Sequence, residues 1–79
     1  MESLTFKLEE FEGPLDLLLY LVGKNKMDLH EIAILDLIDQ YTAVINTLTE
    51  HRLDVASQFI EMAARLVQIK SSMLLPKHE

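Results

Sequence analysis

Residues 53–76 read LDVASQFIEMAARLVQIKSSMLLP, and this stretch decides the fold class. Apolar residues recur along it at alternating spacings of four and three, which is the period of one face of an α-helix. Proline cannot continue a helix, so Pro76 marks the end and we expect a helix from about Leu53 to Leu75. The stretch therefore predicts a helical protein with a long carboxyl-terminal helix.

Two apolar seams run side by side along this predicted helix. The first seam holds the larger side chains and consists of Val55, Phe59, Met62, Leu66, Ile69 and Met73. The second seam lies about 100° round the helix and consists of Ala56, Ile60, Ala63, Val67 and Leu74. Together they are wider than the stripe by which a surface helix packs on its own domain. We expect the first seam to close the core and the second to bind a partner; the alternative is that both are internal.

Lys70 stands between the two seams, near the carboxyl end of the predicted helix. Its stem could lie along apolar surface while its ammonium reaches a carboxylate of the partner. The alternative is an interaction with the last carbonyl groups of the helix. With Lys70 included, the predicted partner-binding residues are Ala56, Ile60, Ala63, Val67, Lys70 and Leu74.

Two shorter helices are predicted before the long one. Pro14 occupies a permitted first helical position, and the almost wholly apolar run at residues 15–22 predicts a helix that is buried nearly all round and ends at Gly23. Asp28 is placed to cap a second helix. One helical stripe follows it, formed by Ile34, Ile38, Tyr41, Ile45 and Leu48.

The amino-terminal residues follow a different period. Leu4, Phe6 and Leu8 alternate with polar residues, which is typical of a short strand with one face on a core. Such a strand would pair with another chain, unless the segment is an extended arm. The predicted fold class is therefore all-α: residues 1–79 form one small three-helix domain with a short extended N-terminal arm or strand and a long C-terminal helix.

Composition restricts the classes of function. The chain has 79 residues without cysteine, and 49% of them are hydrophobic, which is more than so small a domain can hide and favours a partner. Its net charge is −6, and the seven Lys and Arg residues are scattered singly, so we expect no direct nucleic-acid or membrane binding. No signal peptide is apparent, so a cytoplasmic location is expected.

No residue pattern indicates catalysis, a cofactor or a metal. The histidines His30, His51 and His78 are far apart, and two glycines are too few for a phosphate-binding loop. Ser71 and Ser72 lack the motif of an activated nucleophile. We therefore expect a protein that is not an enzyme and binds no cofactor.

Two motifs resemble those of a known family: FEGPLDLLL at residues 11–19 and IKSSMLLP at residues 69–76. With them, nearly all 79 residues resemble the amino-terminal domain of bacterial segregation and condensation protein A, the kleisin of the SMC condensin-like complex. Ala33 departs from the family pattern, which often has proline there, so a kink in the second helix is in doubt.

The resemblance implies a helical domain without an active site that docks its third helix on the coiled-coil neck beside an SMC ATPase head. Such a chain would be a fragment of a longer protein that bridges two SMC heads near the nucleoid, in chromosome condensation and segregation. The family's central segment, which binds segregation and condensation protein B, and its carboxyl-terminal domain would lie outside this chain.

A second hypothesis comes from another class of function. The chain could be a self-associating structural module, a homodimer in which the second seam and the segment from Leu4 to Leu8 bury each other. Both hypotheses could hold for a fragment, and sedimentation separates them: a strict monomer disfavours self-association, whereas a tight dimer that covers Ala56 and Ala63 disfavours simple adaptor docking.

Overall fold

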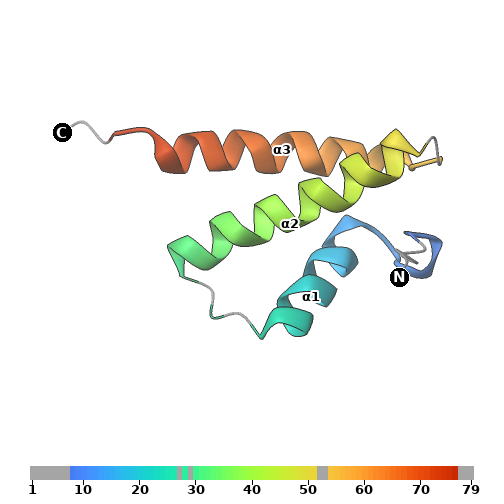
Figure 1. Cartoon of the computed structure of the whole chain (residues 1–79), viewed down its shortest axis with the longest axis horizontal. Helices are drawn as coiled ribbons and strands as arrows, with labels where there is room; N and C mark the ends of the chain where they lie inside the picture. Colours follow the sequence, from blue (N-terminus) through green and yellow to red (C-terminus); the bar gives the residue numbers. More distant parts are fainter. Residues whose placement is uncertain (1–7, 27, 29, 52–53, 77–79) are drawn as a thin grey trace.

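The computed structural model describes residues 8–26, 28, 30–51 and 54–76. Within these ranges the chain forms a short 3-10 helix, η1 (Leu8–Glu10), and three α-helices: α1 (Pro14–Asn25), α2 (Glu31–Glu50) and α3 (Ser57–Leu74). α2 lies between α1 and α3, and α3 runs back along α2 in the opposite direction (Figure 1). The prediction of an all-α, three-helix domain is confirmed.

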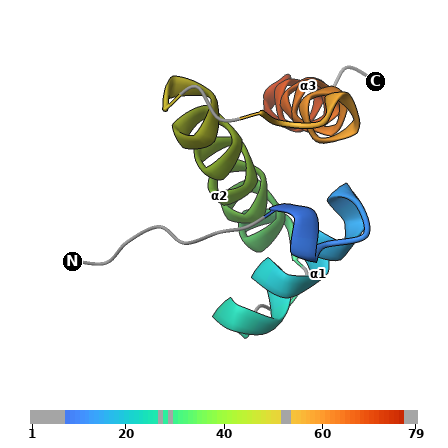
Figure 2. The same cartoon turned by 90° about the vertical axis from the view of Figure 1, so that its right-hand side faces the viewer.

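The core lies where the three helices meet. α2 contributes the stripe that the sequence predicted, of which Ile38, Tyr41, Ile45 and Leu48 are buried and Ile34 is half-buried. α1 adds Leu17 and Leu21 from one side, and α3 adds Phe59 and Leu66 from the other. The view along the bundle shows α1 and α3 packed against different sides of α2 (Figure 2).

The end of α1 differs from the prediction. The helix continues through Gly23 to Asn25, and Lys26 takes the left-handed conformation, with φ 50° and ψ 48°. The side chain of Asn25 donates hydrogen bonds to the carbonyl oxygen of Leu21 at 2.7 Å and to Oε1 of Gln40 on α2 at 2.8 Å. This contact with α2 supports one more half-turn, so Gly23 does not end the helix.

α1 is also less buried than predicted. Leu17 and Leu21 are buried, whereas Leu15 and Leu19 remain 66% and 69% exposed. The described chain covers α1 only on the side that faces α2 and α3, because it supplies no further helix for the outer side. The prediction of burial nearly all round is therefore wrong.

α2 begins at a different cap from the predicted one. His30 is the N-cap, and its Nδ1 accepts a hydrogen bond from the backbone N–H of Ala33 at 3.3 Å. Asp28 lies outside the helix and is exposed. The helix is continuous through Ala33, and its 20 residues make it longer than α3.

α3 is shorter at its start than predicted. It begins at Ser57 with Ala56 as the N-cap residue, so Asp54 precedes the helix, and it ends at Leu74. Leu75 is extended, as expected of a residue that precedes proline. The predicted start at Leu53 and the strand residues 4–7 lie outside the described residues, and Leu8 belongs to η1 rather than to a strand.

Candidate functional site

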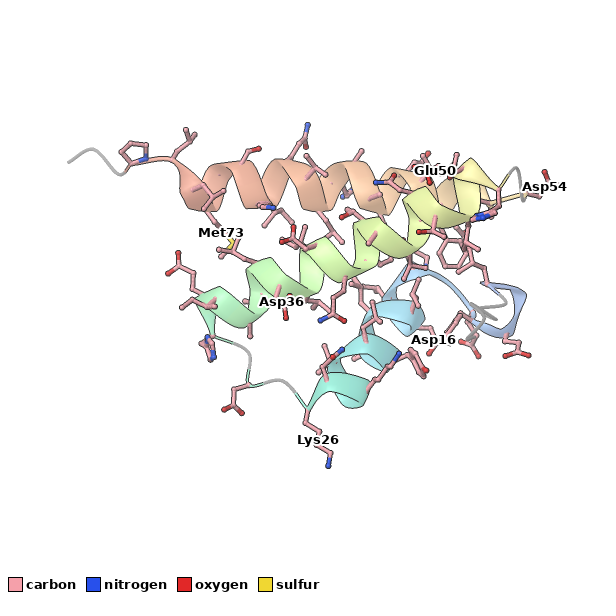
Figure 3. The ribbon with its side chains drawn as sticks, in the orientation of Figure 1. Asp16, Lys26, Asp36, Glu50, Asp54 and Met73 are labelled. Atoms are coloured by element: carbon pink, nitrogen blue, oxygen red, sulfur yellow. The ribbon has the colours of Figure 1, made fainter. Side chains whose placement is uncertain are left out.

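The first seam of α3 includes the residues by which this helix enters the core. Phe59 and Leu66 are buried, and Val55 and Met62 pack against the core. The half-buried side chain of Met73 points from α3 toward α2 (Figure 3). Ile69 differs, because it lies at the margin of this face and is 47% exposed. The prediction that this seam closes the core is therefore confirmed except at Ile69, which is exposed, and at Met73, which is not among the residues packed against the core.

The second seam points mainly to the outside. Ile60, Val67 and Leu74 are 47%, 50% and 62% exposed, and Ala56 is exposed at the N-cap. Ala63 differs from them because it is half-buried and packs against the core. The structure thus brings four of the six predicted site residues onto one outward face, with Ala63 and Lys70 at its border with α2.

Two residues of this face were missed by the sequence prediction. Ala64 and Ser71 are exposed, and helical geometry places both between the larger residues of the second seam. The spacing of four and three that continues from Ile60 would have found them. We call the whole surface the α3 strip and define it as Ala56, Ile60, Ala64, Val67, Ser71 and Leu74, which lie within about 80° of arc.

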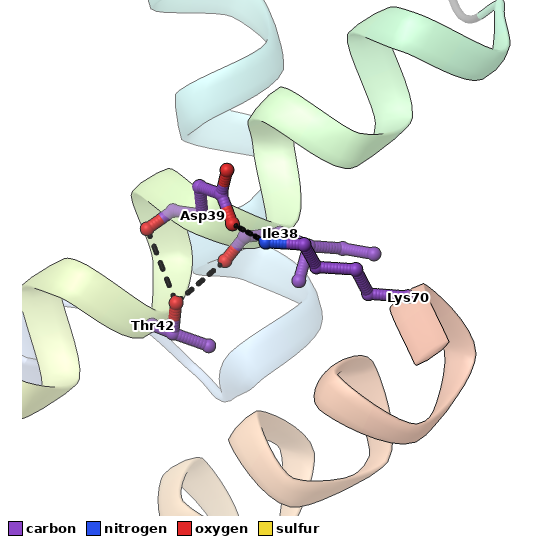
Figure 4. Close-up of polar contacts among 4 residues, drawn as sticks. All are labelled: Ile38, Asp39, Thr42 and Lys70. Atoms are coloured by element: carbon purple, nitrogen blue, oxygen red, sulfur yellow. Dashed lines mark hydrogen bonds and ion pairs between the residues drawn. The ribbon is translucent and has the colours of Figure 1, made fainter. Parts of the chain in front are cut away.

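Lys70 makes an ion pair within the chain. Its Nζ lies 2.6 Å from Oδ1 of Asp39 on α2 (Figure 4). Next to this pair, the hydroxyl of Thr42 donates to the carbonyl oxygens of Ile38 and Asp39. The ammonium therefore binds a carboxylate of its own domain, which is neither of the two interpretations drawn from the sequence.

A buried hydrogen bond fixes the other end of α3. The hydroxyl of Tyr41 on α2 donates to the carbonyl oxygen of Phe59 at 2.9 Å. Burial raises the pKa of Tyr41 to about 12. α3 is therefore held against α2 by its core residues Phe59 and Leu66 and by the bond from Tyr41 near its start, and the exposed ion pair with Asp39 lies near its end.

The α3 strip is suited to recognition rather than to proton transfer. Its members are aliphatic residues and one serine, and none of them is ionisable near neutral pH. Among the residues that the structure describes, no three His, Asp or Glu side chains come together in a metal-binding arrangement. In the same described residues, no helix is both long and apolar enough to cross a membrane.

Comparison with known proteins gives one family. The family described as segregation and condensation protein ScpA matches residues 21–79. Segregation and condensation protein A from Bacillus cereus strain B4264 is 54% identical over 74 residues, and that from Bacillus anthracis strain CDC 684 is 53% identical over the same length. Each alignment covers 94% of this chain and 30% of the relative, so the chain spans about 30% of the length of these relatives.

Proposed function

This chain belongs to the family of segregation and condensation protein ScpA, and we propose that it is a non-catalytic adaptor of an SMC complex in chromosome condensation and segregation. In this proposal the α3 strip docks on the coiled-coil neck of an SMC ATPase. The names of the relatives support the role in segregation and condensation. The exposed aliphatic surface of α3 supports the mode of docking.

The observation that carries the proposal is the pattern of the α3 strip. From Ile60 onward its residues are spaced by four, three, four and three, which is the spacing of a seam that packs against another helix. Large residues alternate with Ala64 and Ser71, and these small positions leave room for side chains of the facing helix. A coiled-coil neck offers a helical surface of this kind, whereas a nucleic acid does not.

The dimensions of α3 fit such a partner. Its 18 residues form a helix about 27 Å long. Three large aliphatic side chains of the α3 strip are about half exposed, so burial of each against a partner would contribute roughly 1 kcal/mol to the free energy of binding. The helix does not have to be ordered on binding, because Phe59 and Leu66 already pack in the core and Tyr41 already bonds to the carbonyl oxygen of Phe59.

The charge of the chain is consistent with a protein partner. The net charge is −6, and no basic residue belongs to the α3 strip. Contact with DNA would need a cluster of Lys and Arg side chains that face the phosphates. We therefore propose that the chain reaches the nucleoid through its SMC partner, in the cytoplasm, and not through direct contact with DNA.

Further contacts of the complete protein are part of the same proposal. Since the chain spans about 30% of its relatives' length, contact with segregation and condensation protein B is assigned to other regions of such a protein. The domain described here contributes the SMC contact, and it brings no chemistry of its own to the ATPase cycle.

Calorimetric titration against an SMC head fragment that retains its neck tests the proposal. Val67→Glu places a charge in the centre of the α3 strip, and we expect binding at least roughly tenfold weaker, because the carboxylate would be buried without a partner. Ala63 is avoided, since it packs against the core. Circular dichroism of the variant should remain that of the wild type, because Val67 is exposed.

Leu19→Glu is the matched control, because Leu19 is 69% exposed, compared with 50% for Val67, and lies on α1 instead of the α3 strip. It should bind the SMC fragment like the wild type. Equal binding by Val67→Glu would place the interface away from the α3 strip. Absence of binding by the wild type would reject the adaptor and favour the self-associating module.

A further inference from the structure

Lys70 carries a charge at the border between the α3 strip and α2. It stands three positions after Val67 and four before Leu74, so helical spacing places it beside both of these strip residues. The strip itself holds aliphatic residues and one serine, without a charge. A helix that docks on the strip therefore comes close to the side chain of Lys70 along the edge that faces α2.

The ion pair with Asp39 directs the ammonium of Lys70 away from the strip. Nζ of Lys70 lies 2.6 Å from Oδ1 of Asp39, and the side chain reaches across from α3 to α2 (Figure 4). Ile60, Val67 and Leu74 point mainly to the outside instead. The aliphatic stem of Lys70 thus lies next to the apolar surface, while its charge lies at the carboxylate on α2.

We infer that Asp39 is a positioning residue for docking on the SMC neck, an inference that rests on the function proposed above. Asp39 holds the ammonium of Lys70 at α2, which keeps an unpaired charge away from the edge of the α3 strip. The aliphatic stem of Lys70 then extends the apolar surface that the neck covers. Asp39 acts through Lys70 and makes no contact of its own with the neck.

The removal of water on docking gives this pairing its effect. A partner on the α3 strip excludes water from the edge of the strip, and a charge that loses water without gaining a partner opposes binding. The carboxylate of Asp39 supplies that partner in advance. Since the two side chains are 35% and 58% exposed, the effect has the size of an exposed ion pair, which corresponds to about two- to fivefold in Kd.

Two other roles of the pair give different results. If Lys70 bound a carboxylate of the neck, Asp39 would compete with the neck for the ammonium, so loss of Asp39 would strengthen binding. If Asp39 itself bound a base of the neck, its loss would weaken binding whether or not Lys70 were present. A positioning residue weakens binding on its loss only while the charge of Lys70 is there to be held.

A double-mutant cycle of binding separates these roles. The wild type, Asp39→Asn, Lys70→Met and the double variant are each titrated by calorimetry against an SMC head fragment that retains its neck. Asp39→Asn should bind about two- to fivefold more weakly than the wild type. In the Lys70→Met background the same change should leave the Kd unaltered, because methionine keeps an apolar side chain without a charge.

Asp36→Asn is the matched control. It removes an exposed carboxylate from the preceding turn of α2, where Oδ2 of Asp36 accepts a hydrogen bond from the side chain of Gln40 at 3.2 Å. This variant changes the net charge as Asp39→Asn does, and it should bind like the wild type. Urea unfolding midpoints close to that of the wild type in both variants would show that the loss of binding is not a loss of folding.

Three results of the cycle would overturn the inference. They are tighter binding by Asp39→Asn, equal weakening in both backgrounds, and no effect of Asp39→Asn at all. Such a result with Val67→Glu still impaired would reject this inference alone. A wild type that does not bind, or a Val67→Glu variant that binds equally well, would reject the proposed function and this inference with it.

Discussion

The hydroxyl of Tyr41 donates a hydrogen bond to the carbonyl oxygen of Phe59 at 2.9 Å, and both side chains are buried between α2 and α3. The bond joins the middle of α2 to the first turn of α3. It therefore places the start of the α3 strip relative to the rest of the domain.

This bond predicts a loss of stability at high pH. Burial raises the pKa of Tyr41 from 10.0 to about 12, so the folded state holds the proton more tightly than the unfolded state. The corresponding stability is fully present below pH 10 and is lost as the pH rises toward 12. We expect the free energy of unfolding to fall by roughly 2 kcal/mol across this window from Tyr41 alone.

Tyr41→Phe isolates this contribution. At neutral pH the variant should lose about 1 kcal/mol of stability, because one buried hydrogen bond is removed. Between pH 10 and 12 its stability should decline less than that of the wild type, in urea titrations at each pH. Parallel curves for the two proteins would contradict the assignment of this titration to Tyr41.

The ion pair between Lys70 and Asp39 is predicted to contribute little to stability. Its nitrogen and oxygen are 2.6 Å apart, but the two side chains are 35% and 58% exposed. Water and salt screen such a pair, so a double-mutant cycle with Lys70→Met and Asp39→Asn should give a coupling energy below about 1 kcal/mol. A larger value would indicate that the pair is the main attachment of the end of α3.

The sequence predicted those features that depend on local period. Ile38, Tyr41, Ile45 and Leu48 share one face at helical spacing, and the structure buries all four. The outward position of Ile60, Val67 and Leu74 was predicted in the same way, because the apolar arc of residues 53–75 is wider than α2 can cover.

Features that depend on contacts between helices were not predictable. Lys70 meets Asp39 31 positions away in the sequence, and no local rule identifies that partner. The end of α1 depends on the bond from Asn25 to Gln40, so the rule for glycine at a helix end failed at Gly23. Burial of α1 was overestimated because composition does not state how many elements surround a helix.

Two leucines of α1 can test whether this helix is buried on one side only. Leu17 is completely buried, whereas Leu19, two positions later, is 69% exposed. Leu17→Ala should lower the free energy of unfolding by about 2–5 kcal/mol, because it leaves a cavity in the core. Leu19→Ala should change it by at most about 0.5 kcal/mol at low protein concentration. Equal losses would mean that α1 is covered on both sides.

The sequence and the structure give different N-cap residues for α2, and this difference can be tested. The structure makes His30 the N-cap, and its bond to the N–H of Ala33 is long at 3.3 Å. Aspartate and asparagine are better N-caps, and a carboxylate also interacts favourably with the positive end of the helix dipole. We expect His30→Asp to raise the free energy of unfolding by about 0.5–1 kcal/mol in urea titrations.

Asp28→Ala is the matched control for this prediction. If Asp28 capped α2, as the sequence predicted, its loss would cost about 1 kcal/mol. In the structure Asp28 is exposed and precedes the cap by two positions, so we expect a change within about 0.5 kcal/mol. A clear loss of stability in Asp28→Ala, together with no gain in His30→Asp, would move the start of α2 to Asp28. The first turn of the helix would then include His30, which the structure places at the N-cap.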